Sequence, residues 1–534
     1  MEITRRQGLM GLAALAAAPA LLPGEAAAQS RAETLRQVTG GAVNTLDPTM
    51  PGSTRESFGI SMNVYDRLVG FGRKMVGGNW VFDHTEIRGE LAERYEISAD
   101  GLVITLHLRR DALWHDGTPV TAEDVKWSLD RHVSSKSLAV SQFQTGSLTS
   151  TEQFRIVDAH TVQVVLDKPD RLALSNLAVP YAIMINSRLA KQNATPDDPW
   201  AQKWMQANTA AGGAYKVESF RPGVQVVLAR NEAWKGGPLP FFRRVISQSV
   251  PEAATRANLI EKGDADLAID LQAGDIAALT QRAQVKVASI PQSNGFTHIS
   301  FNTRQAPFDN PKVRQAIAAA LPYEDMFKAS LFSRGRVLFG ADWKVPPNAD
   351  FPQALPMRQD LARARALLTE AGLADGFATT FSFGTSTAAT SEPLAALVQE
   401  ALAKVGIRVE IQKLPDAQLN TLQAEKKLAF YTDSGTAWLP ATYYFFYLYF
   451  TRDQRWNFAN WENARITELS NAARFERDTA AYEAQCKEMI SILADQLPLL
   501  LLWQPNMDAV MNKAIEGFTY QFYRQVDFRD LKRA

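Results

Sequence analysis

The sequence has very little cysteine and histidine for its length. Cys486 is the single cysteine among 534 residues, and only six histidines are present. One cysteine cannot form an intramolecular disulfide, and it excludes a metal site built from several thiolates. Cys486 lies in a helical pattern, which favours a small buried residue. The histidines show no metal-ligand spacing, so we expect no bound metal ion and no cofactor.

An excess of charge of either sign is also missing, as are long apolar runs. The 57 basic residues balance 57 acidic ones. A neutral chain gives no support for binding nucleic acid or an anionic membrane surface. The apolar runs 11–22 and 497–503 are too short to span a bilayer. The second of these is expected to be a buried strand.

Sequence motifs of common enzyme classes are absent. The chain contains no GxSxG, no HExxH and no glycine-rich phosphate loop. Asp264 and Asp266 look like paired carboxylates for acid/base chemistry, but their setting is that of a helix exit followed by a strand. We therefore expect a protein that is not an enzyme.

The N-terminus has the pattern of an export signal. Arg5 and Arg6 form a twin-arginine pair, a weakly apolar alanine-rich segment follows, and Ala26–Ala28 supplies small residues for cleavage. Residues 1–28 are thus predicted to be a twin-arginine signal peptide, which indicates a periplasmic location.

The most informative stretch runs from Leu91 to His132. A short strand, an Asp100–Gly101 turn and a return strand rich in β-branched residues form a predicted hairpin. Thr121 then caps a helix, with Asp124 at the third helical position in a variant of the capping box. Periodicity alone indicates an ordinary hairpin followed by a helix.

The literal string in this stretch, LAERYEISADGLVITLHLRRDALWHDGTPVTAEDVKWSLDRH, resembles the signature of the extracellular solute-binding proteins of family 5. These are the receptors of ABC importers for peptides, nickel and oligosaccharides. Two later strings, FNTRQAPFDNPKVRQAIAAAL and DLARARALLTEAG, are similar to further family motifs. The resemblance implies an α/β, two-lobed periplasmic-binding-protein fold (type II, cluster C) with an extra domain inserted in lobe I.

The resemblance also implies an order of domains along the chain. Strands near 287–290 and 499–503 are expected to cross between the lobes as a hinge. The expected segments are the signal at 1–28, the first part of lobe I at 29–74, the extra domain at 75–185, the second part of lobe I at 186–290, lobe II at 291–498, and a C-terminal return to lobe I at 499–534.

By the same resemblance, the protein captures a peptide-like or other polar small solute by hinge closure. It would deliver this small-molecule or oligopeptide ligand to the permease subunits of an ABC transporter in the inner membrane, and it would act as a monomer. Two alternatives use the same fold: a secreted enzyme, which would need a reactive cluster that is not visible, and a chaperone or sensor receptor.

Two segments provide the candidate ligand-binding residues. In relatives, the loop before the helix that begins at Arg55 faces the ligand, which makes Gly52, Ser53 and Thr54 candidates; a plain helix cap explains the same residues equally well. The second segment, 429–450, is rich in aromatic residues. Core packing of a strand and a helix accounts for most of its rings. The remaining candidates are Trp343, Asp433, Thr436, Trp438 and Tyr444.

The chain departs from the peptide-binding pattern at one point of the second segment. Relatives that bind peptides carry WxxDxxxP, whose aspartate pairs with the amino terminus of the peptide, but the position three residues after Trp438 is Ala441. A buried ammonium without a counter-charge is costly. Asp433 could substitute for the missing carboxylate. Otherwise opines, sugar conjugates or modified peptides become the better candidates, because sugars stack on aromatic rings.

Overall fold

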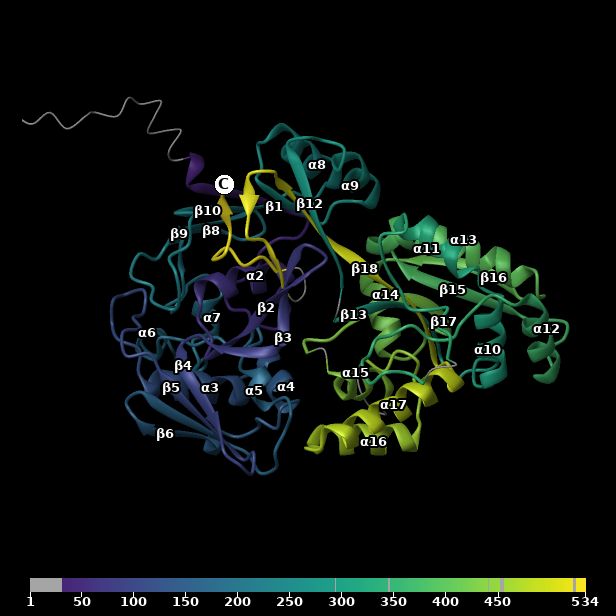
Figure 1. Cartoon of the computed structure of the whole chain (residues 1–534), viewed down its shortest axis with the longest axis horizontal. Helices are drawn as coiled ribbons and strands as arrows, with labels where there is room; N and C mark the ends of the chain where they lie inside the picture. Colours follow the sequence, from purple (N-terminus) through teal and green to yellow (C-terminus); the bar gives the residue numbers. More distant parts are fainter. Residues whose placement is uncertain (1–30, 293, 344–345, 440, 452–455, 522–524) are drawn as a thin grey trace, which may run out of the picture.

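The computed structural model describes residues 31–534 except 293, 344–345, 440, 452–455 and 522–524. The predicted signal peptide therefore lies outside the described residues. The chain folds into two lobes, each built on a β-sheet with helices packed against it, and a smaller all-antiparallel sheet adjoins lobe I (Figure 1). This is the predicted α/β, two-lobed architecture with an extra domain.

One long strand, β18 (Leu499–Asn512), belongs to both lobes. Its first half pairs with β13 (Gly295–Phe301) of lobe II. Its second half pairs with β12 (Val285–Pro291) and with β11 (Leu267–Ile269) of lobe I. β12 and β13 are consecutive in the chain, so the two expected hinge segments lie where the sequence predicts them.

The sheet of lobe I is centred on β1 (Thr34–Thr39). A strand–helix–strand unit follows from β10 (Arg244–Ser249), α8 (Ala253–Lys262) and β11. Its two strands are not neighbours in the sheet, because β1 lies between them and is parallel to both. The hairpin of β8 (Tyr215–Arg221) and β9 (Gln225–Arg230) extends the sheet beyond β10. Helix α2 begins at Arg55, as predicted, and spans Arg55–Val64.

The sheet of lobe II continues from β13 through β17 (Phe430–Thr436) and β15 (Ala378–Gly384) to β16 (Arg408–Leu414). Asn310 caps its first helix, and Pro311 occupies the first helical position, where its missing N–H costs nothing. The remaining elements of this lobe are α10 (Pro311–Ala320), α11 (Tyr323–Leu331), β14 (Gly335–Val337), α12 (Leu361–Glu370), α13 (Ala388–Ala403), α14 (Asp416–Ala424), α15 (Thr442–Phe450), α16 (Ala464–Phe475) and α17 (Thr479–Gln496).

The extra domain contains the signature stretch. Its sheet has the order β4 (Ala92–Ile97), β5 (Val103–Leu108), β7 (Thr161–Val165) and β6 (Phe154–Asp158). The predicted capping box begins α3 (Ala122–Ser134), where the Asp124 carboxylate accepts hydrogen bonds from the backbone N–H and the hydroxyl of Thr121. Shorter helices follow as α4 (Leu138–Gln144), α5 (Ala173–Asn176), α6 (Ser187–Gln192) and α7 (Gln202–Met205).

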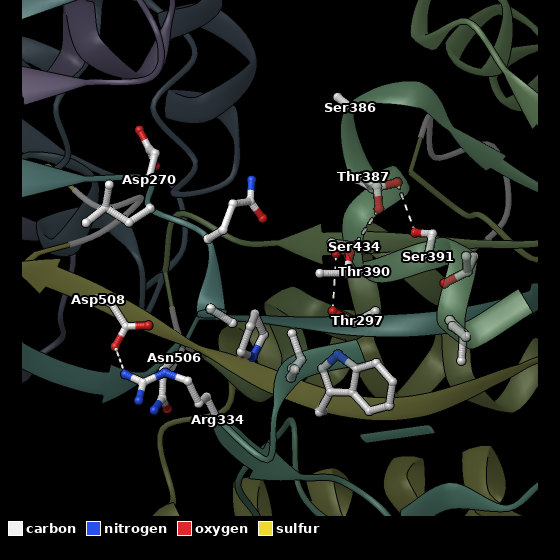
Figure 2. A pocket seen from close by; sticks show the side chains of 18 of the residues that line it. Asp270, Thr297, Arg334, Ser386, Thr387, Thr390, Ser391, Ser434, Asn506 and Asp508 are labelled. Atoms are coloured by element: carbon white, nitrogen blue, oxygen red, sulfur yellow. Dashed lines mark hydrogen bonds and ion pairs between the residues drawn. The ribbon is translucent and has the colours of Figure 1, made fainter. Parts of the chain in front are cut away.

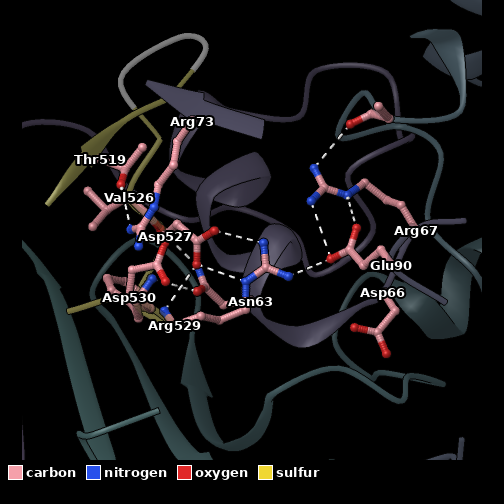
Figure 3. A network of polar contacts seen from close by, with 12 residues as sticks. Asn63, Asp66, Arg67, Arg73, Glu90, Thr519, Val526, Asp527, Arg529 and Asp530 are labelled. Carbon is pink, nitrogen blue, oxygen red and sulfur yellow. Dashed lines mark hydrogen bonds and ion pairs between the residues drawn. The ribbon is translucent and has the colours of Figure 1, made fainter. Parts of the chain in front are cut away.

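A buried ionic network fixes the C-terminal return to lobe I (Figure 3). The Glu90 carboxylate accepts hydrogen bonds from Arg67, at 2.9 Å, and from Arg529, which also binds Asp527 at 2.7 Å. Burial acts to raise the pKa of Glu90, but the two guanidinium groups outweigh it and hold the pKa below its usual value. The network joins β3 (Asn79–Gly89) and β2 (Val69–Val76) to the last residues of the chain, which add β20 (Thr519–Tyr520) to the same sheet.

His298 is an uncharged polar residue in the core of lobe II. It lies on β13, fully buried against Phe296 and Phe458, and neither ring nitrogen has a hydrogen-bond partner. Burial lowers its pKa to about 3. An unfolded histidine titrates near pH 6.5, so the unfolded chain binds a proton that the folded chain does not as the pH falls below 6.5.

We therefore expect His298 to reduce the free energy of unfolding by about 2 kcal/mol between pH 7 and pH 5. The variant His298→Leu should lose that part of the pH dependence, because every other group titrates as before. Urea unfolding of both proteins at the two pH values measures the difference. The control variant His107→Gln leaves the buried His298 ring in place. Its free energy of unfolding should therefore retain most of the wild-type pH dependence. An unchanged pH dependence in His298→Leu would contradict the prediction.

Candidate ligand-binding cleft

A cleft of about 390 Å³ lies between the two lobes, over the strand that they share. Lobe I contributes the segment that follows β11, lobe II contributes β17 and the first turn of α13, and β18 forms the floor (Figure 2). In α/β folds, ligands bind at the carboxyl ends of the strands, and β11, β15 and β17 all end here. The volume suits a small solute.

Hydroxyl groups form the lobe II wall of the cleft. Its members are Thr297, Ser386, Thr387, Thr390, Ser391, Thr432 and Ser434. The Asp416 carboxylate holds the start of this wall in place by accepting hydrogen bonds from the backbone N–H of Ser386, at 3.1 Å, and from its hydroxyl, at 2.9 Å. A wall of this kind offers both donors and acceptors to a polar ligand.

The charges that line the cleft are unequal. Three carboxylates, on Asp270, Asp433 and Asp508, stand against one guanidinium, on Arg334. Arg334 binds the Asp508 carboxylate at 2.6 Å, and Ser289 donates to the same carboxylate. The ion pair therefore neutralises Asp508. Asp270 is paired with Arg55, at 2.7 Å, from outside the cleft lining.

Asp433 lines the cleft at β17 without a positive partner, and its side chain lies on the opposite face of the strand from those of Thr432 and Ser434. Its carboxylate accepts hydrogen bonds from the Gln423 amide at 2.8 Å and from the backbone N–H of Ser434 at 2.7 Å. Across the described part of the chain, no Lys, Arg or His side chain forms an ion pair with it. Burial raises the pKa of Asp433. A cationic group entering the cleft would offset this desolvation.

Asp270 faces the cleft from lobe I at the end of β11. Its backbone has a φ of 62°, a left-handed conformation that costs a non-glycine residue free energy and often occurs at functional sites. The Arg55 guanidinium binds its carboxylate at 2.7 Å, and the backbone N–H of Gly40 donates to the same oxygen at 3.3 Å. The start of α2 thus contributes to the lobe I rim through Arg55.

The predicted loop before α2 does not line this cleft. The Ser53 hydroxyl donates to the Asp47 carbonyl at 3.0 Å, and the Asn44 amide donates to the Gly52 carbonyl at 2.9 Å. Thr54 is the N-cap of α2, and its hydroxyl accepts from the backbone N–H of Ser57. Their polar groups are engaged within the loop, which agrees with the helix-cap interpretation.

Trp438 and Tyr444 contact the other half of the molecule. The Trp438 ring lies edge-on to Phe58 of α2, with ring centroids 5.2 Å apart, and to Tyr181, at 4.9 Å. The buried Tyr444 hydroxyl donates to the side-chain carbonyl of Gln142, on α4, at 3.2 Å. Both residues therefore join lobe II to lobe I or to the extra domain.

The last two candidates lie elsewhere in lobe II. The Thr436 carbonyl accepts from the Tyr449 hydroxyl at 2.5 Å. Trp343 lines a separate hollow with Met357 and Asp360, so the expectation that it faces the interlobe cleft is not met. Of the eight predicted residues, Asp433 alone lines the cleft.

Sequence reasoning missed Asp270, Arg334, Asp508 and the hydroxyl wall. The one available signal was the position of Asp270 directly after a strand of the parallel type. The carboxylates that did attract attention have another role, since Asp266 is buried and binds Arg31 at 2.9 Å and Arg533 at 2.8 Å. Asp266 thereby holds the two ends of the described chain together.

Two further properties bear on the class of protein. No helix in the described part of the chain is long and apolar enough to cross a bilayer. Within the same residues, no group of three or more His, Cys, Asp and Glu side chains could hold a metal ion. Two lobes, a shared hinge strand and a polar cleft between them define a solute-binding protein that closes on its ligand.

The comparison with protein families identifies which kind it is. The model of the bacterial extracellular solute-binding proteins, family 5, matches residues 86–457. The chain belongs to this family. It is a substrate-binding component of an ABC transporter, and it captures a peptide-like or other polar solute.

Curated relatives and solved structures agree with this assignment. The chain is 28% identical to the probable D,D-dipeptide-binding periplasmic protein DdpA of Escherichia coli K12, over 89% of each chain. It is 26% identical to the glutathione-binding protein GsiB of Salmonella choleraesuis, over 90% of each. The fold is similar to that of AgaA from A. tumefaciens R10 in complex with agropinic acid (TM-score 0.75, 24% identity, 94% of this chain and 99% of that chain).

The helix-cap interpretation of Thr54 makes a prediction. Thr54→Ala removes the acceptor for the Ser57 N–H and should lower the free energy of unfolding by about 1 kcal/mol. Thr54→Ser should restore most of it. Urea unfolding of the three proteins measures the effect. If Thr54→Ala leaves stability unchanged and instead weakens ligand binding, the loop contacts ligand.

Proposed function

We propose that the ligand is a peptide-like or related small solute that carries an ammonium or another cationic group. The observation that carries this proposal is the carboxylate of Asp433, a residue that lines the interlobe cleft; its pKa is raised by burial, and it has no positive partner among the described residues. A ligand cation beside Asp433 would supply the missing charge. It would also satisfy a carboxylate that is costly to leave unpaired.

The opposite wall supports the same ligand class. Asp270 presents a second carboxylate, and the Arg55 guanidinium that binds it at 2.7 Å also binds Glu56 at 2.9 Å. The hydroxyl wall of lobe II would bind the uncharged polar groups of the ligand. A solute that contacts both lobes favours the closed state by its differential affinity for that state.

The proposed setting follows from the relatives and from the N-terminal sequence. DdpA and GsiB are named for the binding of D,D-dipeptides and glutathione, both of which contain an amine. The twin-arginine pattern supports export to the periplasm. There the protein acts as a monomer, without an enzymatic reaction, and passes its solute to the permease subunits. Gly52, Ser53, Thr54, Thr436, Trp438 and Tyr444 contribute by shaping the lobes around the cleft.

Replacing the proposed counter-charge tests the ligand class. Asp433→Asn keeps an acceptor for Gln423 but removes the charge, so affinity for a free-amine dipeptide should fall by roughly 10- to 100-fold, as for the loss of a charge-assisted hydrogen bond. Titration calorimetry with D-alanyl-D-alanine, L-alanyl-L-alanine and glutathione measures it. N-acetylation of a ligand that binds should lower its affinity for the wild type by a similar factor. The same modification should change its affinity for Asp433→Asn only slightly.

A surface variant provides the control. Asp375→Asn removes a carboxylate from an exposed turn of lobe II and should leave binding unchanged. Equal affinities of wild type and Asp433→Asn for a free-amine ligand would contradict the proposed role of Asp433. If none of the amines binds but an uncharged sugar does, the ligand class itself is wrong.

A further inference from the structure

We propose that a second contact between the lobes, remote from the ligand cleft, biases the ligand-free protein toward its closed form. The contact joins the extra domain to α15, α16 and α17 of lobe II. We call it the clasp and define it by Gln142, Ser147, Asp170 and Arg171 on the extra domain and by Tyr444, Arg474 and Tyr482 on lobe II.

A buried ion pair lies at the centre of the clasp. Arg474 binds the Asp170 carboxylate at 2.8 Å; the Asp170 side chain has no exposed surface, and that of Arg474 is 19% exposed. The same guanidinium donates to the Gln144 carbonyl at 2.7 Å and to the Ser147 hydroxyl at 3.1 Å. Ser147 in turn donates to Asp170 at 2.7 Å. The Arg474 guanidinium therefore has three acceptors across the domain boundary, on Gln144, Ser147 and Asp170.

Two contacts flank the ion pair. The Arg171 guanidinium lies 4.3 Å from the centroid of the Tyr482 ring and donates to the Glu476 carbonyl at 2.5 Å. On the other side, Tyr444 donates to Gln142, which itself donates to the Asn176 amide oxygen at 2.7 Å. The clasp therefore extends over several elements and is not one isolated pair.

Backbone geometry also singles out this contact. Ser147 has a φ of 60°, which an L-residue adopts at a cost unless its surroundings fix it. Its hydroxyl is held between Asp170 and Arg474. The contacts of the closed form thus help to hold a conformation that would be disfavoured in an isolated turn.

The position of the clasp gives it control over closure. In Figure 1, α16 and α17 form the lower part of lobe II, beside the extra domain. β12 and β18 cross between the lobes on the opposite, upper side. None of the residues that define the clasp lines the cleft. Opening the lobes about the crossing strands would separate the clasp first, because it lies farthest from the hinge. The open form must therefore break the Asp170–Arg474 pair and expose both charges.

Removing the pair should open the ligand-free protein. In Arg474→Met, the apolar stem remains and the charge is lost, so the ratio of open to closed molecules should rise on the order of tenfold. Small-angle X-ray scattering of protein refolded from denaturant, which removes co-purified ligand, measures the radius of gyration. The wild-type profile should fit the closed coordinates, and that of Arg474→Met should be more extended.

Matched variants separate opening from misfolding. Arg465→Met removes a guanidinium from the same helix, where Arg465 pairs with Glu488 within lobe II at 2.7 Å, and it should leave the scattering unchanged. Arg171→Met changes an exposed clasp residue and should open the protein to a smaller degree. If circular dichroism shows that Arg474→Met is unfolded, the scattering of Arg171→Met tests the proposal in its place. An already extended wild type, or folded clasp variants that scatter like the wild type, would overturn the proposal.

Discussion

The architecture depends on the hydrogen bonds of one strand. β18 pairs with β13 in lobe II and with β12 and β11 in lobe I, so the two sheets share a continuous backbone ladder. Because the ladder cannot be broken without leaving buried peptide groups unpaired, the lobes can rotate but cannot separate. Asp508, which pairs with Arg334, lies on this strand. The floor of the cleft is therefore the least deformable part of the site.

The walls of the cleft are under a different constraint, since they can move apart. Closure brings the Asp433 carboxylate into a partly desolvated space without a cation, which is unfavourable on its own. The clasp stabilises the closed form through its buried ion pair and ring contacts. A ligand that neutralises Asp433 needs to supply only the remaining difference between the two forms. Such a balance keeps the protein able to release its solute.

Local sequence patterns predicted local structure well. The capping box at Thr121 and Asp124 is confirmed, as is the hairpin with its turn at Asp100 and Gly101. Each of these depends on residues close together in the chain, whose geometry is set by backbone chemistry. The family resemblance supplied the rest of the fold, which the family model confirms.

Contacts between distant segments could not be predicted in the same way. Arg131 of the signature helix is fully buried against Asp47, 84 residues earlier, and nothing in either local pattern indicates the partner. The cleft likewise combines Asp270 and Asp433 from different lobes. The loop at Gly52 resembled a ligand loop because a helix cap and an anion site use the same donors, and only the contacts of Thr54 distinguish them.

The aromatic residues around Trp438 bear on the missing carboxylate at Ala441. Phe58 and Tyr181 both contact the Trp438 ring, so protein side chains occupy part of the surface that an aromatic wall would otherwise offer to a ligand. Asp433 lies on β17, upstream of Trp438, and is among the residues that line the cleft. The negative charge that recognises the ligand is thus better placed at Asp433, where the cleft has room for an ammonium.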